Sequence, residues 1–282
     1  MVRPVIDFHT HPWMPDDLAP ATRDFIGRIS PAVAEHGDRL RDPAYAADVL
    51  RAQGVEHAVV LAEHCPRTSG DVRTESVLEF CHGSDGFYLP FASVDPNTDP
   101  APAALLDRYI DAGIRGLKLY PSYQFFYPDD PRVHPLYEVC QRHGLPVLLH
   151  IGSSVIPGTR LAYCDPIRLD AVAVDFPTLN IVIAHGGRGY WHDECAFLAS
   201  HYRNVYIDVT GLVPGRLLEH FPDLPRNADK YVFGSDWPAM PKSPGENVRV
   251  IEGLDLEADA LDRVFRRNAA RLLGIPIGPT AA

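Results

Sequence analysis

Short apolar runs alternate with amphipathic, helix-like stretches along the chain, and this alternation limits the possible folds more than any other feature. Strand-like runs separated by helical patterns indicate βαβ units and a parallel sheet. The predicted strands are Val2–Phe8, Glu56–Leu61, Phe87–Ala92, Ile114–Leu119, Pro146–Leu149, Leu179–Ala184, Val205–Val209 and Tyr231–Phe233. Eight such units in 282 residues predict an α/β fold, a (β/α)8 TIM barrel, with residues 1–282 forming one domain. The alternative, a doubly wound sheet, would want a glycine-rich turn after the first strand, where His9-Thr10-His11-Pro12 stands instead.

The composition favours a soluble protein that acts on a small-molecule substrate. Lys and Arg number 26 against 37 Asp and Glu, and the net charge of −11 argues against nucleic acid or an anionic membrane as the main partner. The five cysteines form no Cys-x-x-Cys pair and no even-numbered disulfide framework, so we expect a reducing, cytoplasmic setting. The sequence has neither a signal-peptide pattern nor an apolar run near the roughly 18 residues that span a bilayer.

Two histidines follow the first apolar run. Side chains alternate faces along a strand, so His9 and His11 are expected to point the same way and Thr10 the other way. Two imidazoles on one side of a strand end can share a metal ion. A surface pair at a frayed strand end is the alternative for this motif when it is taken alone.

Further polar side chains stand at the carboxyl ends of later predicted strands. They are Lys118 near the end of the fourth strand, His150 after the fifth, His185 after the sixth and Asp236 after the eighth. Each has an ordinary structural explanation, such as a buried, hydrogen-bonded histidine or a carboxylate that caps a turn. In a barrel, however, all these strand ends meet at one face, so nitrogen and oxygen ligands converge there. The set therefore predicts a metal site.

The same residues lie in motifs that resemble the amidohydrolase superfamily, in particular its branch containing aminocarboxymuconate-semialdehyde decarboxylase. The motifs span nearly the whole chain: Ile6-Asp7-Phe8-His9-Thr10-His11, Gly116-Leu117-Lys118-Leu119-Tyr120-Pro121, Leu149-His150, Ala184-His185-Gly186-Gly187, Gly234-Ser235-Asp236-Trp237-Pro238 and Asn268-Ala269-Ala270-Arg271-Leu272-Leu273-Gly274.

The resemblance implies a ligand set and an oligomeric state. One divalent metal, Zn²⁺ or alternatively Mn²⁺, would be held by His9, His11, His150 and Asp236. His185 would act on the substrate as a catalytic residue, and relatives are often homodimers. Lys118 has three interpretations: a carboxylated lysine that bridges two metals, a cation that contacts a substrate carboxylate, or a lysine anchored to a neighbouring acid.

Hydrolysis is the first reaction that we predict. Metal-activated water would attack an amide, lactone or ester bond of a small molecule that carries a carboxylate, with Asp236 as the catalytic proton shuttle and His185 acting on the substrate oxygen. The alternative is a metal-dependent, non-oxidative decarboxylase (carboxy-lyase) of an unsaturated or aromatic acid. A third interpretation is a non-catalytic binding protein that contains a metal.

Two long connections, Pro12–Arg41 and Pro121–His134, follow the first and fourth predicted strands and would lie beside the metal site. The second is rich in aromatic residues, which would either pack on one another or face the substrate. Near these segments and the metal motifs we predict four substrate-binding residues: Trp13, Tyr120, Arg188 and Trp237. Surface exposure is the alternative for Arg188, and core packing is the alternative for the two tryptophans.

Overall fold

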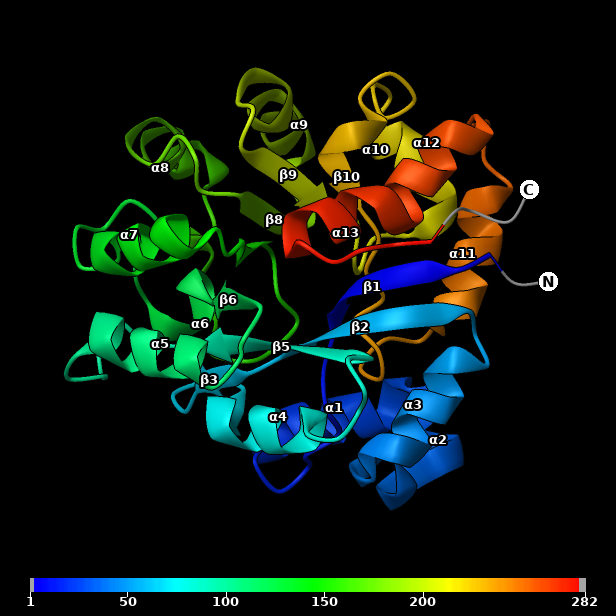
Figure 1. Cartoon of the computed structure of the whole chain (residues 1–282), viewed down its shortest axis with the longest axis horizontal. Coiled ribbons are helices and arrows are strands. Elements are labelled where there is room, and N and C mark those ends of the chain that lie inside the picture. The colour runs from blue at the N-terminus through cyan, green and yellow to red at the C-terminus, as the bar shows by residue number, and fades with distance from the viewer. Residues whose placement is uncertain (1–2, 279–282) are drawn as a thin grey trace.

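Eight parallel strands form the centre of the computed structural model, which describes residues 3–278 (Figure 1). Their order in the sheet is β1-β2-β5-β6-β7-β8-β9-β10. Their bounds are β1 Val5–Thr10, β2 Val55–Leu61, β5 Tyr88–Ser93, β6 Gly116–Leu119, β7 Val147–Gly152, β8 Ile181–Arg188, β9 Val205–Asp208 and β10 Tyr231–Val232. Phe8 N donates to the carbonyl of Phe233 at 2.9 Å, which joins the two edges. The sheet is therefore a nearly closed barrel, and the predicted TIM-barrel fold is confirmed.

Helices surround the strands (Figure 1). They are α1 Pro20–Ile29, α2 Pro31–His36, α3 Pro43–Arg51, α4 Thr74–Cys81, α5 Pro102–Asp111, α6 Pro121–Gln124, α7 His134–His143, α8 Leu169–Asp175, α9 His192–His201, α10 Leu217–His220, α11 Pro244–Glu252, α12 Ala258–Asp262 and α13 Asn268–Leu273. Local signals set many of their ends. The Asp42 side chain caps α3 before a proline at the first helical turn, and Ser243 and Glu246 form a reciprocal capping box at α11. None of the helices within residues 3–278 has the length and apolar character needed to cross a membrane.

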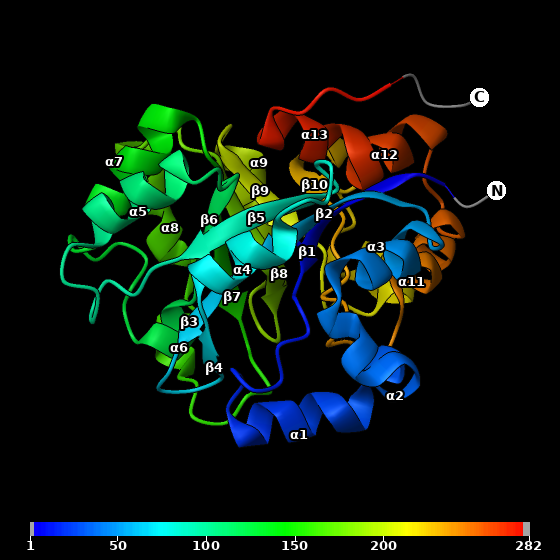
Figure 2. The same ribbon diagram turned by 60° about the horizontal axis from the view of Figure 1, so that its bottom comes forward.

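The apolar runs located the strands, but their edges differ from the prediction. The first strand runs from Val5 to Thr10 rather than ending at Phe8, and the predicted start at Val2 lies outside the described residues. A hairpin of β3 (Glu63–Cys65) and β4 (Gly70–Val72) follows β2, where no strand was predicted. The first long connection contains α1 and α2. Figure 2 shows α1 and α13 at opposite ends of the barrel.

The barrel interior is filled from alternate positions of the strands. Phe8 and Phe91 are fully buried there and meet edge to face, with ring centroids 5.6 Å apart. A Cβ on Gly116 would lie only 2.3–2.7 Å from the Phe91 ring, so this position of β6 requires glycine. Apolar residues of α13 belong to the same cluster and close one end of the barrel. The opposite end is left for polar side chains.

The seam between β1 and the segment after β10 is held by the buried carboxylate of Asp7. It accepts hydrogen bonds from the backbone N of Ser235 at 2.9 Å, the Ser235 hydroxyl at 2.6 Å and the backbone N of His9 at 3.2 Å. Beyond it, Asp236 N donates to the His9 carbonyl and His11 N donates to the Trp237 carbonyl, both at 2.8 Å. The first and last strands are therefore joined next to the predicted metal ligands.

We expect Asp7→Ala to lower the free energy of unfolding by about 2–4 kcal/mol, because it leaves buried backbone donors without an acceptor. Urea denaturation of the metal-free protein measures the change. Ser235→Ala, which removes one donor and leaves the carboxylate, should cost about 1 kcal/mol. Equal stability of Asp7→Ala and the wild type would show that the seam does not depend on this carboxylate.

Candidate active site

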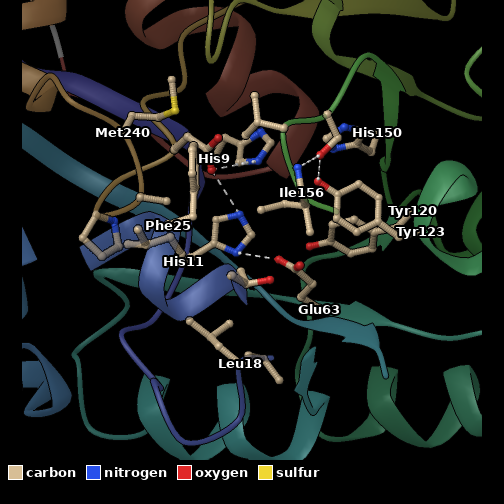
Figure 3. Close-up of a pocket in the computed structure, with 18 of the residues that line it drawn as sticks. His9, His11, Leu18, Phe25, Glu63, Tyr120, Tyr123, His150, Ile156 and Met240 are labelled. Carbon is tan, nitrogen blue, oxygen red and sulfur yellow. Dashed lines mark hydrogen bonds and ion pairs between the residues drawn. The ribbon is translucent and has the colours of Figure 1, made fainter. Parts of the chain in front are cut away.

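A cavity of about 840 Å³, its open mouth included, lies at the carboxyl end of the barrel strands. All four predicted ligands, His9, His11, His150 and Asp236, line it, together with His185, Glu63 and Arg188. Several of its other walls are apolar, formed by Trp13, Leu18, Phe25, Ile26, Ile156 and Met240. Figure 3 shows His11 within this cavity, between His9 and Glu63. The structure therefore brings the predicted metal ligands together.

Asp236 lies beside both histidines of the His-x-His motif. Its Oδ1 is 3.2 Å from Nε2 of His11 and 3.7 Å from Nε2 of His9. One nitrogen from each of His9 and His185 and one oxygen of Asp236 all lie within 4.8 Å of one another, which makes these three a candidate group for one metal ion. This group includes His185, which we predicted to act on the substrate. The assignment of His11 and His150 as ligands stays a prediction.

The inward orientation of His9 and His11 depends on an irregularity in β1. Phe8 belongs to the interior cluster, so strict alternation would turn His9 to the opposite face. The register between β1 and β2 shifts between Asp7 and Thr10, and both histidines line the cavity. Thr10 is turned aside, because its hydroxyl donates to the Val59 carbonyl at 2.7 Å.

A buried carboxylate holds His9 from behind. Nδ1 of His9 lies 2.6 Å from Oδ2 of Asp208, and both side chains are almost fully buried. Asp208 also accepts hydrogen bonds from the backbone N and the hydroxyl of Thr210. Burial and the nearby Lys118 ammonium lower the pKa of His9, so its imidazole is neutral, with Nδ1–H donating to Asp208 and the Nε2 lone pair facing the cluster. A Cβ on Gly234 would lie 2.7 Å from both Asp208 and His9, so glycine is required there.

His185 and His150 form a second buried pair. Nδ1 of His185 lies 3.1 Å from the Thr210 carbonyl, and its Nε2 lies 3.1 Å from Nδ1 of His150. Burial lowers the pKa of both imidazoles well below the usual value, so both are neutral. His185 must then donate to Thr210 and accept from His150. This leaves Nε2 of His150 as a buried nitrogen with no hydrogen-bond partner within residues 3–278.

This arrangement fits a divalent metal. Neutral imidazoles and an ionised carboxylate are ligands of Zn²⁺ and Mn²⁺, and the unpaired nitrogen of His150 is a buried lone pair that lacks a donor. Burial alone would raise the pKa of Asp236, but the hydrogen bond from His11 and the positive charge of Arg188 hold that pKa below its usual range. Asp236 is therefore ionised at neutral pH.

Two of these side chains are held by strained backbone. His185 and Asp236 both have a φ of +62°, in the left-handed region that non-glycine residues seldom adopt. Such conformations cost on the order of 1–3 kcal/mol and are concentrated at functional sites. The hydrogen bond from Asp236 N to the His9 carbonyl stabilises this turn.

The remaining predicted site residues divide into two groups. Trp13, Tyr120 and Arg188 line the cavity. Trp237 is buried and Lys118 is fully buried, and neither is among the lining residues in the described part of the chain. Nζ of Lys118 lies 4.9 Å from the centre of the Tyr120 ring and has no hydrogen-bond partner within residues 3–278, so its predicted anchoring to an acid is not observed.

The aromatic connection after β6 serves both roles that the sequence left open. Tyr120 and Tyr123 line the cavity, and Tyr123 meets His150 edge to face with centroids 4.9 Å apart. Phe126 is buried, and Tyr127 packs on Tyr163. Asp208, the carboxylate behind His9, was not among the predicted site residues, although its place at the end of β9 was a usable signal.

Solved structures of other proteins share this fold. An uncharacterised TIM-barrel protein from Bordetella bronchiseptica is 25% identical, with a TM-score of 0.78 over 96% of this chain and 98% of that one. A 2,6-dihydroxybenzoate decarboxylase in complex with 2,6-dihydroxybenzoate is 18% identical, with a TM-score of 0.72 over 97% and 100%. A 5-carboxyvanillate decarboxylase from Novosphingobium aromaticivorans, complexed with manganese and 4-hydroxy-3-methoxy-5-nitrobenzoic acid, is 16% identical, with a TM-score of 0.70 over 97% and 96%.

No curated protein matches the sequence. The amidohydrolase family, in contrast, matches residues 6–275, a span that includes every strand of the barrel and every histidine of the cluster. The chain therefore belongs to the amidohydrolase family of metal-dependent enzymes.

Proposed function

We propose that the protein is a metal-dependent decarboxylase of a small unsaturated or aromatic carboxylate. The observation that carries this proposal is the place of Arg188, whose side chain lines the same cavity as the cluster of histidines and Asp236. A guanidinium is well suited to hold a carboxylate, and the apolar walls suit a flat hydrocarbon body. Solved structures of decarboxylases with the same fold support this choice.

The metal would be held by His9, His185 and Asp236, with His11 and His150 as the further candidate ligands. When bound, a divalent ion supplies Lewis-acid chemistry, which withdraws charge from a substrate oxygen. The neutral state of His9 and His150 keeps their Nε2 lone pairs available for this purpose, and the Nε2 lone pair of His185 would bind the ion in place of its hydrogen bond from His150.

Arg188 would bind the carboxylate that leaves. Its Nε and Nη2 donate to the Ser153 carbonyl at 3.2 and 2.8 Å, which fixes the guanidinium plane. Nη1 has no acceptor within residues 3–278, so part of the guanidinium is available to an anion. The apolar walls exclude water and strengthen this contact.

Asp236 would move the proton. Because it is ionised, its Oδ1 first takes a proton from the bound substrate or from water. The bond between the substrate carbon and its carboxylate then breaks, carbon dioxide leaves, and the electron pair stays on that carbon. Asp236 returns the proton to this carbon, so one proton is consumed for each carboxylate that is released as carbon dioxide.

Hydrolysis of an amide, lactone or ester is the second candidate. The observation that favours it is the same ionised Asp236, 3.2 Å from His11, since this carboxylate can equally take a proton from attacking water. Release of carbon dioxide from hydroxylated aromatic acids, without cleavage of lactones or amides, separates the two reactions.

His9→Ala combined with His11→Ala should abolish metal binding, because the substitutions remove two nitrogens that face Asp236. The metal content of the purified double variant, measured by mass spectrometry, should fall from about one ion per chain to near zero. His82→Ala, at an exposed position outside the cavity, is the control and should retain its metal. Full metal content in the double variant would refute this ligand assignment.

Arg188→Met should lower kcat/KM for a carboxylate such as 2,6-dihydroxybenzoate by about 10–100-fold, because a hydrogen bond to a charged group contributes about 1.5–3 kcal/mol. Carbon dioxide release is the measurement. Arg188→Lys keeps the charge and should recover only part of the loss. An unchanged kcat/KM in Arg188→Met would remove the carboxylate-binding role.

Asp236→Asn should lower kcat by more than about tenfold, equivalent to about 1.4 kcal/mol of barrier, because the amide cannot take and return a proton. Rates are compared at equal metal occupancy, so that loss of a ligand is not mistaken for loss of the proton shuttle. Turnover within tenfold of the wild type would contradict the assignment.

A further inference from the structure

Glu63 is an acidic side chain of the cavity that neither the ligand group nor the proposed reaction uses. It is the first residue of β3 and lines the cavity with 14% of its side chain exposed. Its Oε2 lies 3.6 Å from Nδ1 of His11. Among residues 3–278 this is its one ion pair, and its carboxylate accepts no hydrogen bond. Figure 3 shows this carboxylate directed toward the His11 ring.

Each of the two histidines of the motif lies between two carboxylates. His9 lies between Asp208 at Nδ1, 2.6 Å away, and Asp236 at Nε2, 3.7 Å away. His11 lies between Glu63 at Nδ1, 3.6 Å away, and Asp236 at Nε2, 3.2 Å away. Each imidazole thus has an outer carboxylate on one nitrogen and the shared carboxylate on the other. Imidazoles that bind metals commonly donate their second N–H to such a carboxylate.

The backbone on both sides of Glu63 is anchored by buried side chains. The Tyr120 hydroxyl donates to the Ala62 carbonyl at 2.9 Å, and Nε2 of Gln124 donates to the His64 carbonyl at 3.0 Å. Glu63 also pairs with Val72 across the β3–β4 hairpin. The position of the carboxylate opposite His11 is therefore built into the fold and is not the result of a mobile surface chain.

We propose that Glu63 is a positioning residue: in the metal-bound protein its carboxylate would accept a hydrogen bond from Nδ1–H of His11, so that Nε2 of His11, which donates to Asp236 in this structure, would present its lone pair to the metal. This inference rests on the proposed metal site. It gives the β3–β4 hairpin a function, since the hairpin carries the outer carboxylate for His11 as β9 carries Asp208 for His9.

The test is the affinity of the metal-free protein for Zn²⁺, measured by competition with a chromophoric chelator and without any substrate. Glu63→Ala should weaken binding by about 10–100-fold, as loss of an outer hydrogen-bond partner does at other metal sites. Glu63→Gln keeps an acceptor oxygen and should recover most of the affinity. Glu79→Ala removes one carboxylate from an exposed position of α4 and should bind Zn²⁺ like the wild type. Thermal unfolding of each metal-free variant shows whether it is folded.

A double-mutant cycle with His11→Ala shows whether Glu63 acts through His11. If it does, Glu63→Ala should change the affinity little once His11 is absent, because the two losses are not additive. If Glu63→Ala still weakens Zn²⁺ binding by about 10–100-fold in the His11→Ala background, the proposal is overturned. Wild-type Zn²⁺ affinity of the single variant Glu63→Ala would also overturn it. Absence of Zn²⁺ binding by the wild type would instead refute the proposed metal site itself.

Discussion

The geometry of the site depends on the Asp7 carboxylate, which joins the first strand to the chain after the last one. It holds the backbone of His9 and of Ser235 at the same time, and Asp236 then donates its backbone N–H to the carbonyl of His9. The candidate ligands from the two ends of the chain therefore have a common backbone support. A carboxylate that is not one of the candidate ligands thus supports the backbone of two residues that are.

Burial explains the protonation state of the cluster. Neutral imidazoles are favoured in a site that excludes water. The hydrogen-bond acceptor beside each imidazole then determines which of its two nitrogens carries the hydrogen. Asp208 does this for His9, and the Thr210 carbonyl does it for His185. Asp236 differs because His11 donates a hydrogen bond to it and the positive charge of Arg188 lies nearby, so it keeps its charge despite its burial. The same pocket therefore contains neutral imidazoles and the ionised carboxylate of Asp236, a combination that suits a divalent cation.

Much of the barrel could be predicted because apolar runs report burial, and every strand of a closed barrel is buried. The ends of the strands could not be predicted equally well, since β1 continues through His9 and Thr10, polar residues whose partners lie elsewhere in the fold. The β3–β4 hairpin is short and polar, so it has no apolar run to reveal it. The role of Asp208 was also hidden, because its partner His9 is 199 residues away in the sequence. The convergence of His9, His11, His150 and Asp236 was predictable from strand ends alone, because barrel topology brings those ends to one face.

The seam also links ion binding to the completion of folding. Asp7 and Ser235 are 228 residues apart, and the contact between them brings His9 and Asp236 together where the barrel closes. An ion that binds both residues binds the closed barrel more tightly than a chain in which the barrel is open. By mass action it shifts the equilibrium toward closure, by an amount that grows with the logarithm of its free concentration. The supply of metal in the surroundings would then regulate the lifetime of the folded chain as well as its chemistry.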